Sequence, residues 1–203
     1  IYSGLLDAGR TYGCRIVGGD LSDGPALVIA IAILGTVAPT GPVRRSGAHA
    51  GDSVFVTGEL GAAAAGLALL RRDPESRGDA VEAFLHPKAR IYEGAVAARA
   101  GANAMIDVSD GLGIDLHRLA DASEVGMMLD DVPVATGASL EDALGGGEDY
   151  ELAFTASDVA RVESEFAKSA LRAPLRIGSI VEEGRTRLLR GKPFEPLGFE
   201  HQL

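Results

Sequence analysis

Three acidic segments rich in glycine hold the residues of this chain that are best suited to chemistry. They are residues 18–20 (GGD), 104–112 (AMIDVSDGL) and 145–151 (GGGEDYE). Each segment adjoins a strand-like run, so we expect all three to meet at one edge of a sheet. The alternative is that each pair of glycine and acid only forms a turn, which is the commonest role of such a pair taken singly.

The central segment, residues 104–112, predicts a buried strand, a turn and the start of an amphipathic helix. Asp107, Ser109 and Asp110 would lie between the strand and the helix, where backbone N–H groups point outward and attract oxyanions. Carboxylates alone repel a phosphate, but Mg²⁺ binds both, because it takes a few oxygen ligands together with phosphate oxygens. The segment therefore indicates a site for Mg²⁺ and a nucleotide, unless Asp107 and Asp110 only cap the helix.

Composition narrows the class of protein. The chain has 203 residues, of which 46% are hydrophobic, enough for one full globular domain and part of a second. Its formal net charge of −10 argues against nucleic-acid binding, which needs clustered Lys and Arg. The longest apolar stretch, residues 26–34, is too short to span a bilayer, so we expect a soluble protein that does not bind membranes. The single cysteine favours a cytoplasmic location.

Histidine and cysteine show no zinc-binding pattern. The four histidines lack HxH and HExxH spacing, and the single cysteine, Cys14, leaves no internal disulfide. Cys14 lies in a strand-like run, residues 14–17, where we expect a buried structural thiol.

Hydrophobic periodicity predicts the elements that must position these residues. In the first part of the chain it predicts a helix after Tyr2, a short strand at residues 15–17 and a strand buried on both faces at residues 27–35. Residues 38–42 (APTGP) are typical of a linker. We therefore expect residues 1–36 to be the remnant of a first α/β domain and residues 37–203 to form a complete second one.

The second part of the chain mixes strands and helices. The predicted strands are residues 53–57, the run before Asp107, 126–129, 150–155, 175–181 and 186–189. The predicted helices are residues 62–71, one after Pro87, one with Leu112, Leu116, Leu119 and Ala120 on its buried face, and one with Val159, Val162 and Phe166. Because the alternation is too irregular for a doubly wound sheet, we predict an α/β fold with helices packed on a mixed sheet.

Residues 57–61 (TGELG) form a glycine-spaced turn between a predicted strand and a predicted helix. The turn lacks GxGxxG spacing, and the chain has no GxxxxGK[ST], so neither a Rossmann dinucleotide site nor a P-loop is indicated. We favour the interpretation that these glycines allow close packing of elements over the one in which they contact a ligand.

Taken together, the motifs resemble those of the thiamine-monophosphate kinases. In chain order they are residues 18–20 (GGD), 45–48 (RSGA), 51–52 (GD), 57–58 (TG), 107–112 (DVSDGL), 146–152 (GGEDYEL) and 198–201 (GFEH). GGEDYEL is the most specific, because it separates this family from its relatives in the aminoimidazole ribonucleotide synthetase superfamily, including selenophosphate synthetase. The resemblance also implies that the chain lacks the family's N-terminal segment, which carries further Mg²⁺-binding aspartates.

The resemblance implies the C-terminal α/β domain of the aminoimidazole ribonucleotide synthetase-like fold, a homodimer, and Mg²⁺- and ATP-dependent phosphorylation of thiamine monophosphate to thiamine diphosphate. It assigns Mg²⁺ to Asp20, Asp107 and Asp110. It assigns ATP to Tyr2, Gly19, Asp20, Arg45 and Ser109, and the thiamine moiety to Glu148 and Phe199. It assigns no covalent catalyst, since phosphoryl transfer depends on positioning and charge neutralisation.

Several assignments have simpler alternatives. Tyr2 could pack in a core, Arg45 could be a solvated linker charge, and Phe199 could cover a core edge. Strand alternation points Asp149 and Glu151 away from Glu148. The whole chain could also belong to another ATP-using enzyme of the superfamily, or act as a binding and dimerisation fragment without turnover.

Overall fold

The computed structural model describes residues 1–200, so His201 of the predicted tail lies outside the described residues. The chain divides into two compact units, Ile1–Ala38 (unit 1) and Pro39–Leu203 (unit 2). That unit 1 is the remnant of an ATP-binding domain stays a prediction. Among residues 1–200, no helix is both long and apolar enough to cross a membrane.

Unit 1 contains one helix, α1 (Tyr2–Thr11), in agreement with the predicted periodicity. Residues 12–38, all of them described, form neither helix nor strand, so the strands predicted at 15–17 and 27–35 are wrong. Val28 and Leu34 are 82% and 92% exposed. A strand needs a neighbour for its N–H and C=O groups and a covered face for its side chains, and unit 1 by itself provides neither.

Cys14 is exposed and lies outside any strand, which corrects the expectation of a buried thiol. The reason is the same as for residues 27–35: the run 14–17 has no strand to pair with in unit 1.

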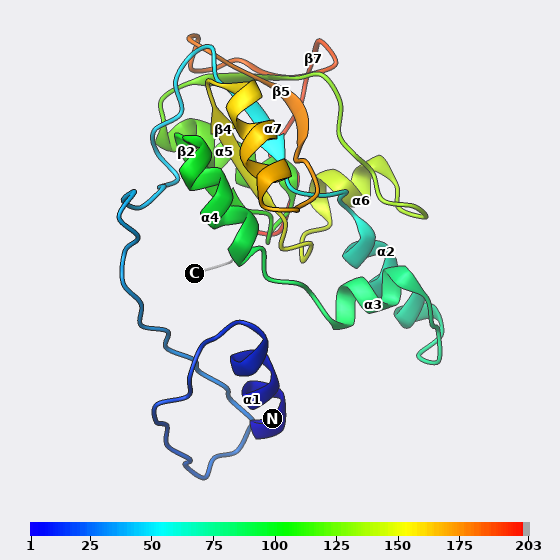
Figure 1. Ribbon diagram of the computed structural model, residues 1–203. Coiled ribbons are helices and arrows are strands. Elements are labelled where there is room, and N and C mark those ends of the chain that lie inside the picture. The colour runs from blue at the N-terminus through cyan, green and yellow to red at the C-terminus, as the bar shows by residue number, and fades with distance from the viewer. Residues whose placement is uncertain (201–203) are drawn as a thin grey trace. The chain divides into compact units, whose positions relative to one another are not determined.

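Unit 2 is built on a seven-stranded sheet with the order β2-β4-β1-β5-β3-β6-β7. The strands are β1 (Ser53–Val56), β2 (Ala104–Asp107), β3 (Gly126–Leu129), β4 (Leu152–Ala156), β5 (Leu175–Val181), β6 (Arg187–Leu189) and β7 (Lys192–Pro193). β3 and β6 pair in parallel, and the other neighbours are antiparallel. The predicted mixed sheet is confirmed (Figure 1).

The helices of unit 2 are α2 (Ala62–Arg72), α3 (Asp79–Leu85), α4 (Ile91–Ala100), α5 (Leu112–Ala122), α6 (Leu140–Gly145) and α7 (Val159–Lys168). The sequence analysis did not predict α3 and α6. These helices are 7 and 6 residues long, too short for a 3.6-residue period to stand out.

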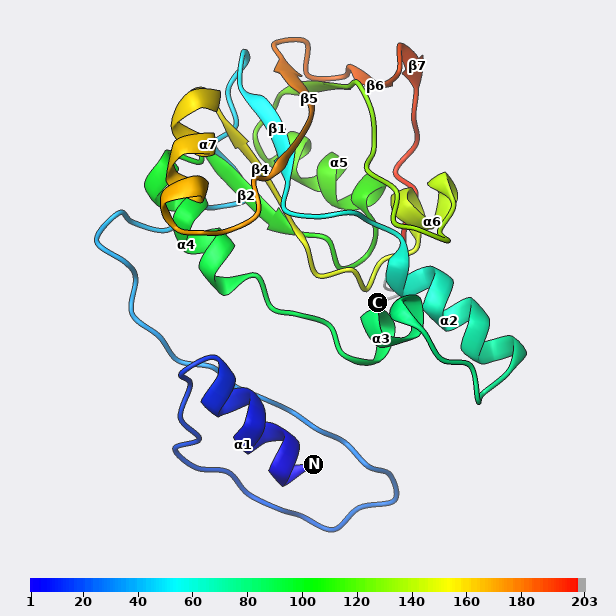
Figure 2. The same cartoon turned by 45° about the vertical axis from the view of Figure 1, so that its right-hand side comes forward.

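The helices cover both faces of the sheet because successive strand residues point to opposite sides. Val54 and Val56 of β1 pack with α5 in one core cluster, whereas Phe55 packs with α4 and α7 in the other. The Phe55 and Phe154 rings stack with centroids 5.1 Å apart. Figure 2 shows the sheet between α5 on one side and α4 and α7 on the other.

One end of the sheet collects three connecting turns. β4 runs antiparallel to both β1 and β2, with Leu152 opposite Asp107 and Ala153 opposite Val56. The end of β1, the end of β2 and the start of β4 therefore lie side by side. The turns at residues 57–61, 108–111 and 146–151 extend from this shared edge.

Candidate functional site

The turns that follow β2 and precede β4 are hydrogen-bonded to each other through their backbones. The Glu148 N–H donates to the Ser109 carbonyl at 2.8 Å, and the Tyr150 N–H donates to the Val108 carbonyl at 2.9 Å. The Val108 N–H donates in return to the Glu151 carbonyl at 2.8 Å. The structure thus brings together two of the three acidic segments.

The third segment, residues 18–20, belongs to unit 1. Gly19 and Asp20 are both exposed there and lie outside helix and strand. Their meeting with the acidic turns of unit 2 stays a prediction.

The turn before α5 is organised by Asp115, a residue that the sequence analysis did not single out. Asp115 is 1% exposed, and its Oδ2 accepts the backbone N–H groups of Ser109, Asp110 and Gly111 at 3.1, 3.0 and 3.2 Å. The expectation that these N–H groups point outward to an oxyanion is wrong, because a carboxylate of the helix itself occupies them. Burial raises the pKa of Asp115, while the hydrogen bonds from Asp110 N–H and Arg118 oppose that rise.

Asp107 and Asp110 do not cap α5. The N-cap residue is Gly111, with no side-chain capping bond. Asp107 is exposed at the end of β2, and Asp110 forms an ion pair with Arg118, which also binds Asp115 Oδ1 at 2.9 Å. The capping alternative is therefore wrong, and the carboxylates of this turn have other partners or face solvent.

Asp107 and Asp110 suit Mg²⁺ only together with further oxygen ligands, such as those of phosphate and water. Among residues 1–200, no three His, Cys, Asp or Glu side chains gather to hold a metal ion. Mg²⁺ is usually held by one or two carboxylates plus phosphate oxygens and water, so Asp107 and Asp110 fit a metal that arrives with a nucleotide.

The turn before β4 has unusual backbone geometry at the two residues that face the acidic turn. Glu148 and Tyr150 have φ values of 61° and 50°, in the left-handed region that non-glycine residues rarely adopt. The Tyr150 hydroxyl donates to Glu148 Oε2 at 3.4 Å. Burial raises the pKa of Tyr150, and the carboxylates of Glu148, Asp107 and Asp110 raise it further.

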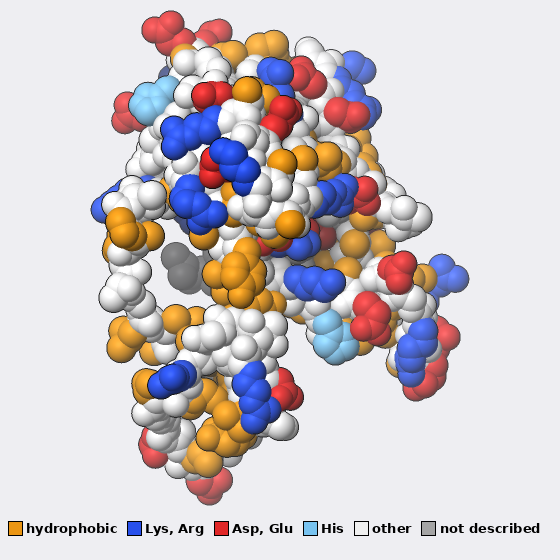
Figure 3. Space-filling view, viewed as in Figure 1, with side chains coloured by type: hydrophobic (Ala, Val, Ile, Leu, Met, Phe, Trp, Pro, Cys, Tyr) orange, Lys and Arg blue, Asp and Glu red, His pale blue; other side chains and the backbone are white. Residues whose placement is uncertain are grey.

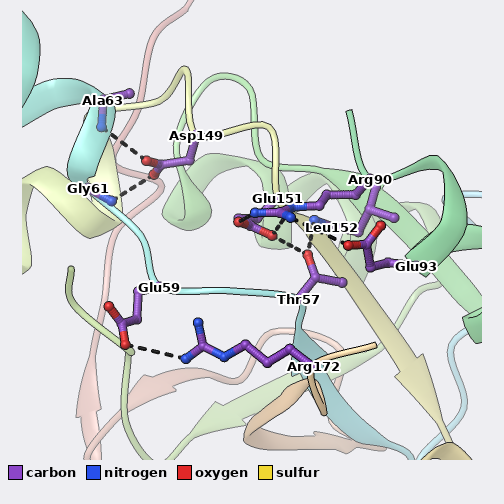
Figure 4. Close-up of polar contacts among 10 residues, drawn as sticks. All are labelled: Thr57, Glu59, Gly61, Ala63, Arg90, Glu93, Asp149, Glu151, Leu152 and Arg172. Atoms are coloured by element: carbon purple, nitrogen blue, oxygen red, sulfur yellow. Dashed lines mark hydrogen bonds and ion pairs between the residues drawn. The ribbon is translucent and has the colours of Figure 1, made fainter. Parts of the chain in front are cut away.

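Asp149, on the same turn, contacts the start of α2 (Figure 4). Its carboxylate accepts the Gly61 N–H at 2.8 Å and the Ala63 N–H at 3.4 Å. Burial raises the pKa of Asp149 to about 6, although these two hydrogen bonds act in the opposite direction. Asp149 therefore serves as a cap for α2 that comes from a distant part of the sequence.

Next to this cap lies a cleft of about 470 Å³ between α2, α3, the segment before α4 and the turn before β4. Its charged lining includes Glu82, His86, Lys88, Arg90 and Asp149. Figure 3 shows acidic, basic and histidine side chains close together over α3. The cleft thus carries charged groups of both signs.

The glycines of residues 57–61 are explained by close packing, as predicted. A Cβ on Gly58 would collide with the Glu151 carboxylate. Gly61 has φ +90°, and a Cβ there would lie 2.7 Å from the Ala143 backbone nitrogen. Gly66, further along α2, lies against the Ala80 carbonyl of α3.

The remaining predicted site residues are exposed. Tyr2 is 65% exposed in unit 1 and Phe199 is 60% exposed, so neither side chain is buried in a core. The Phe199 N–H donates to the Asp110 carbonyl at 2.9 Å, which places Phe199 beside the acidic turn. Arg45 is exposed and follows Arg44, whose carbonyl accepts the Met105 N–H near the opposite end of β2 from Asp107.

A family model described as AIR synthase related protein, C-terminal domain, matches residues 49–190. The chain belongs to this family. Proteins similar to this chain include thiamine-monophosphate kinases, which confirms the resemblance seen in the sequence motifs. The thiamine-monophosphate kinase of Methanospirillum hungatei is 38% identical over 94% of this chain and 64% of that protein. This chain thus spans about two thirds of the length of such relatives.

Solved structures agree with the family assignment. The crystal structure of thiamine monophosphate kinase from Aquifex aeolicus is 30% identical, covers 96% of this chain and 68% of that chain, and has a TM-score of 0.75. The structure of AaThiL complexed with AMPPCP and TMP is 35% identical, covers 79% of this chain and 54% of that chain, and has a TM-score of 0.67.

Proposed function

We propose that this chain acts in the ATP- and Mg²⁺-dependent phosphorylation of thiamine monophosphate to thiamine diphosphate. The observation that carries the proposal is the hydrogen-bonded pairing of the DVSDG and GGEDYE turns at one end of the sheet. The structure of a similar protein complexed with AMPPCP and TMP supports the same substrates.

In this proposal the nucleotide side of the site is the turn after β2. Asp107 and Asp110, with Asp20 of unit 1, would hold Mg²⁺, which neutralises phosphate charge when bound. Ser109 lies between the two carboxylates and would contact ATP, as would Tyr2, Gly19, Asp20 and Arg45. The Asp115 carboxylate keeps the backbone of this turn in place.

The substrate side is the turn before β4 together with Phe199. Glu148 is exposed, and its carboxylate would lie near the cationic thiazolium of thiamine monophosphate. Phe199 offers an exposed aromatic face for a ring of the same substrate. The chemistry needs no covalent intermediate, because positioned phosphates and neutralised charge are sufficient for phosphoryl transfer.

The proposal extends to a cytoplasmic homodimer that binds neither membranes nor nucleic acid. The formal net charge of −10 supports the absence of nucleic-acid binding. The exposed apolar residues of the 27–34 segment support self-association, since contiguous exposed apolar surface is uncommon in monomers.

Binding and turnover can be measured separately to test the function. We expect Mg²⁺-dependent binding of ATP by calorimetry and formation of thiamine diphosphate from thiamine monophosphate by chromatography. Binding without product would favour the alternative of a binding fragment. Absence of both ATP and thiamine monophosphate binding would contradict the proposal.

A further inference from the structure

We propose that Glu151 is a positioning residue for Glu148: its ion pair with Arg90 holds the turn that presents the Glu148 carboxylate to the substrate. The role of Glu148 in this inference rests on the proposed function. The inference adds Glu151, whose side chain bonds Arg90 and Thr57 and not the acidic turn after β2.

The Glu151 carboxylate forms hydrogen bonds with Arg90 and Thr57, which come from different parts of the sequence (Figure 4). It is 5% exposed, and Arg90 reaches it through Nε at 2.9 Å and Nη2 at 2.5 Å. The Thr57 hydroxyl donates to Oε2 at 2.5 Å and accepts the Leu152 N–H at 2.9 Å. The carboxylate therefore links the end of β1, the start of β4 and the segment before α4.

A two-pronged pair of this kind fixes orientation as well as position. The guanidinium fork of Arg90 matches the two carboxylate oxygens, so the Glu151 side chain has one favourable direction. Gly58 lies so close to this carboxylate that a Cβ there would collide with it. The Glu151 side chain is thus closely packed and doubly bonded, which restricts movement of the backbone at residue 151.

The backbone next to Glu151 needs such a restraint. Glu148 and Tyr150, with φ values of 61° and 50°, are in a conformation that is costly for residues with a side chain. Strained conformations persist only where surrounding contacts hold them. On one side the turn is held by its hydrogen bonds to residues 108 and 109, and at its C-terminal end it is held by Glu151.

The chain provides a matched control for this role. Glu93 contacts the same Arg90, at 3.4 Å from Nη1, and among the described residues it has no hydrogen bond or ion pair with the turn. Glu151→Gln and Glu93→Gln each remove one carboxylate from Arg90 and keep the side-chain shape. Only the first variant removes the ion pair that holds the turn.

Hydrogen exchange of the full chain tests the positioning directly. In Glu151→Gln we expect the amides of Glu148 and Tyr150 to exchange about tenfold faster or more, because a charge-assisted hydrogen bond is lost. The Val162 amide of α7 should keep its rate, and Glu93→Gln should leave all of these rates within about twofold. Unchanged exchange at Glu148 and Tyr150, or equal acceleration at Val162, would overturn the positioning role.

Calorimetry tests what the positioned turn binds. Glu151→Gln should weaken thiamine monophosphate binding about tenfold and leave AMPPCP binding within about twofold, whereas a general loss of structure would weaken both. Glu148→Gln should weaken thiamine monophosphate binding without changing exchange at Tyr150. If Glu148→Gln binds thiamine monophosphate as the unmodified chain does, the substrate role of Glu148 fails, while the exchange rates still decide whether Glu151 holds the turn.

Discussion

Asp107 and Asp110 are three positions apart in the same turn but have different surroundings. Asp107 is exposed, while Asp110 shares the guanidinium of Arg118 with the buried Asp115. Arg118 offsets the repulsion between the carboxylates of Asp110 and Asp115, since it pairs with both. Replacing Asp110 therefore breaks an ion pair, whereas replacing Asp107 changes only what the turn offers to a ligand.

Asp107→Asn should lower kcat for thiamine diphosphate formation by on the order of 100-fold at saturating Mg²⁺ and ATP, because it removes one of the carboxylates proposed to hold Mg²⁺. The melting temperature should be unchanged, since the side chain is exposed and does not cap α5. Asp121→Asn, with a side chain that is 72% exposed, is the control and should retain activity. Near-normal turnover in Asp107→Asn would end the metal-site interpretation.

Asp149 should make stability depend on pH in a defined window. Its pKa in the folded chain is about 6, above the ordinary value, so between about 4 and 6 the folded state binds more protons than the unfolded state. Its contribution to the free energy of unfolding therefore falls as pH rises from about 4 to 6 and is constant above that.

Denaturant unfolding of the unmodified chain and of Asp149→Asn across this pH range checks the prediction. Asparagine retains the ability to cap α2 but does not titrate. As pH rises from 4 to 6, the unmodified chain should lose unfolding free energy relative to Asp149→Asn. A difference that is independent of pH would show that Asp149 keeps an ordinary pKa.

At the scale of elements, α5 is joined to the acidic turn by an internal carboxylate. Asp115 lies in the first turn of the helix, and reaches back to three backbone N–H groups that precede or begin it. The six residues 107–112 thus end β2, form the turn and start α5. Helix and turn should lose stability together when this carboxylate is removed.

Asp115→Ala should lower the free energy of unfolding by about 3 kcal/mol or more, because it leaves buried N–H groups without an acceptor. Asp115→Asn keeps one acceptor oxygen and should cost less. Urea unfolding followed by circular dichroism measures both. Asp121→Asn on the same helix removes a 72% exposed carboxylate from Arg187, which keeps its hydrogen bonds to three backbone carbonyls, and should cost less than about 1 kcal/mol. Equal losses of unfolding free energy in Asp115→Ala and Asp121→Asn would contradict the role of Asp115 as a buried hydrogen-bond acceptor.

At the scale of the whole molecule, the chain consists of two units that differ in how their apolar residues are used. Unit 2 buries them in two clusters, one on each face of the sheet. Unit 1 exposes Ile29, Ile31 and Ile33 by 55%, 64% and 77%. These exposed side chains offer an apolar surface that a second copy of the chain would cover.

Sedimentation at tens of micromolar should show a homodimer if this segment mediates association, since a dimer buries apolar surface that the monomer exposes. Replacing Ile29, Ile31 and Ile33 with Ser should give a monomer with the same melting temperature for unit 2. A monomer for the unmodified chain would contradict the homodimer, and a dimer that survives the triple replacement would place the interface elsewhere.

Local sequence patterns predicted most elements of unit 2. Regular patterns in β1, β3, β5, α2, α5 and α7 predicted these elements because their apolar spacing matches the faces they bury. The motifs DVSDG and GGEDYE were also visible, as was the family. Where an element is short, as in α3 and α6, or where an apolar run has no neighbouring strand, as in residues 27–35, local pattern could not decide the structure.

The roles of the charged residues near the site depend on tertiary contacts that no local pattern predicts. Asp115, Asp149 and Glu151 are acidic residues like their neighbours in sequence, yet each has partners that folding brings from elsewhere. Arg90 and Glu151 are 61 positions apart, and Gly61 and Asp149 are 88 apart. Local spacing carries no information about such partners, because they meet only when β4 pairs between β1 and β2 and the helices pack against the sheet.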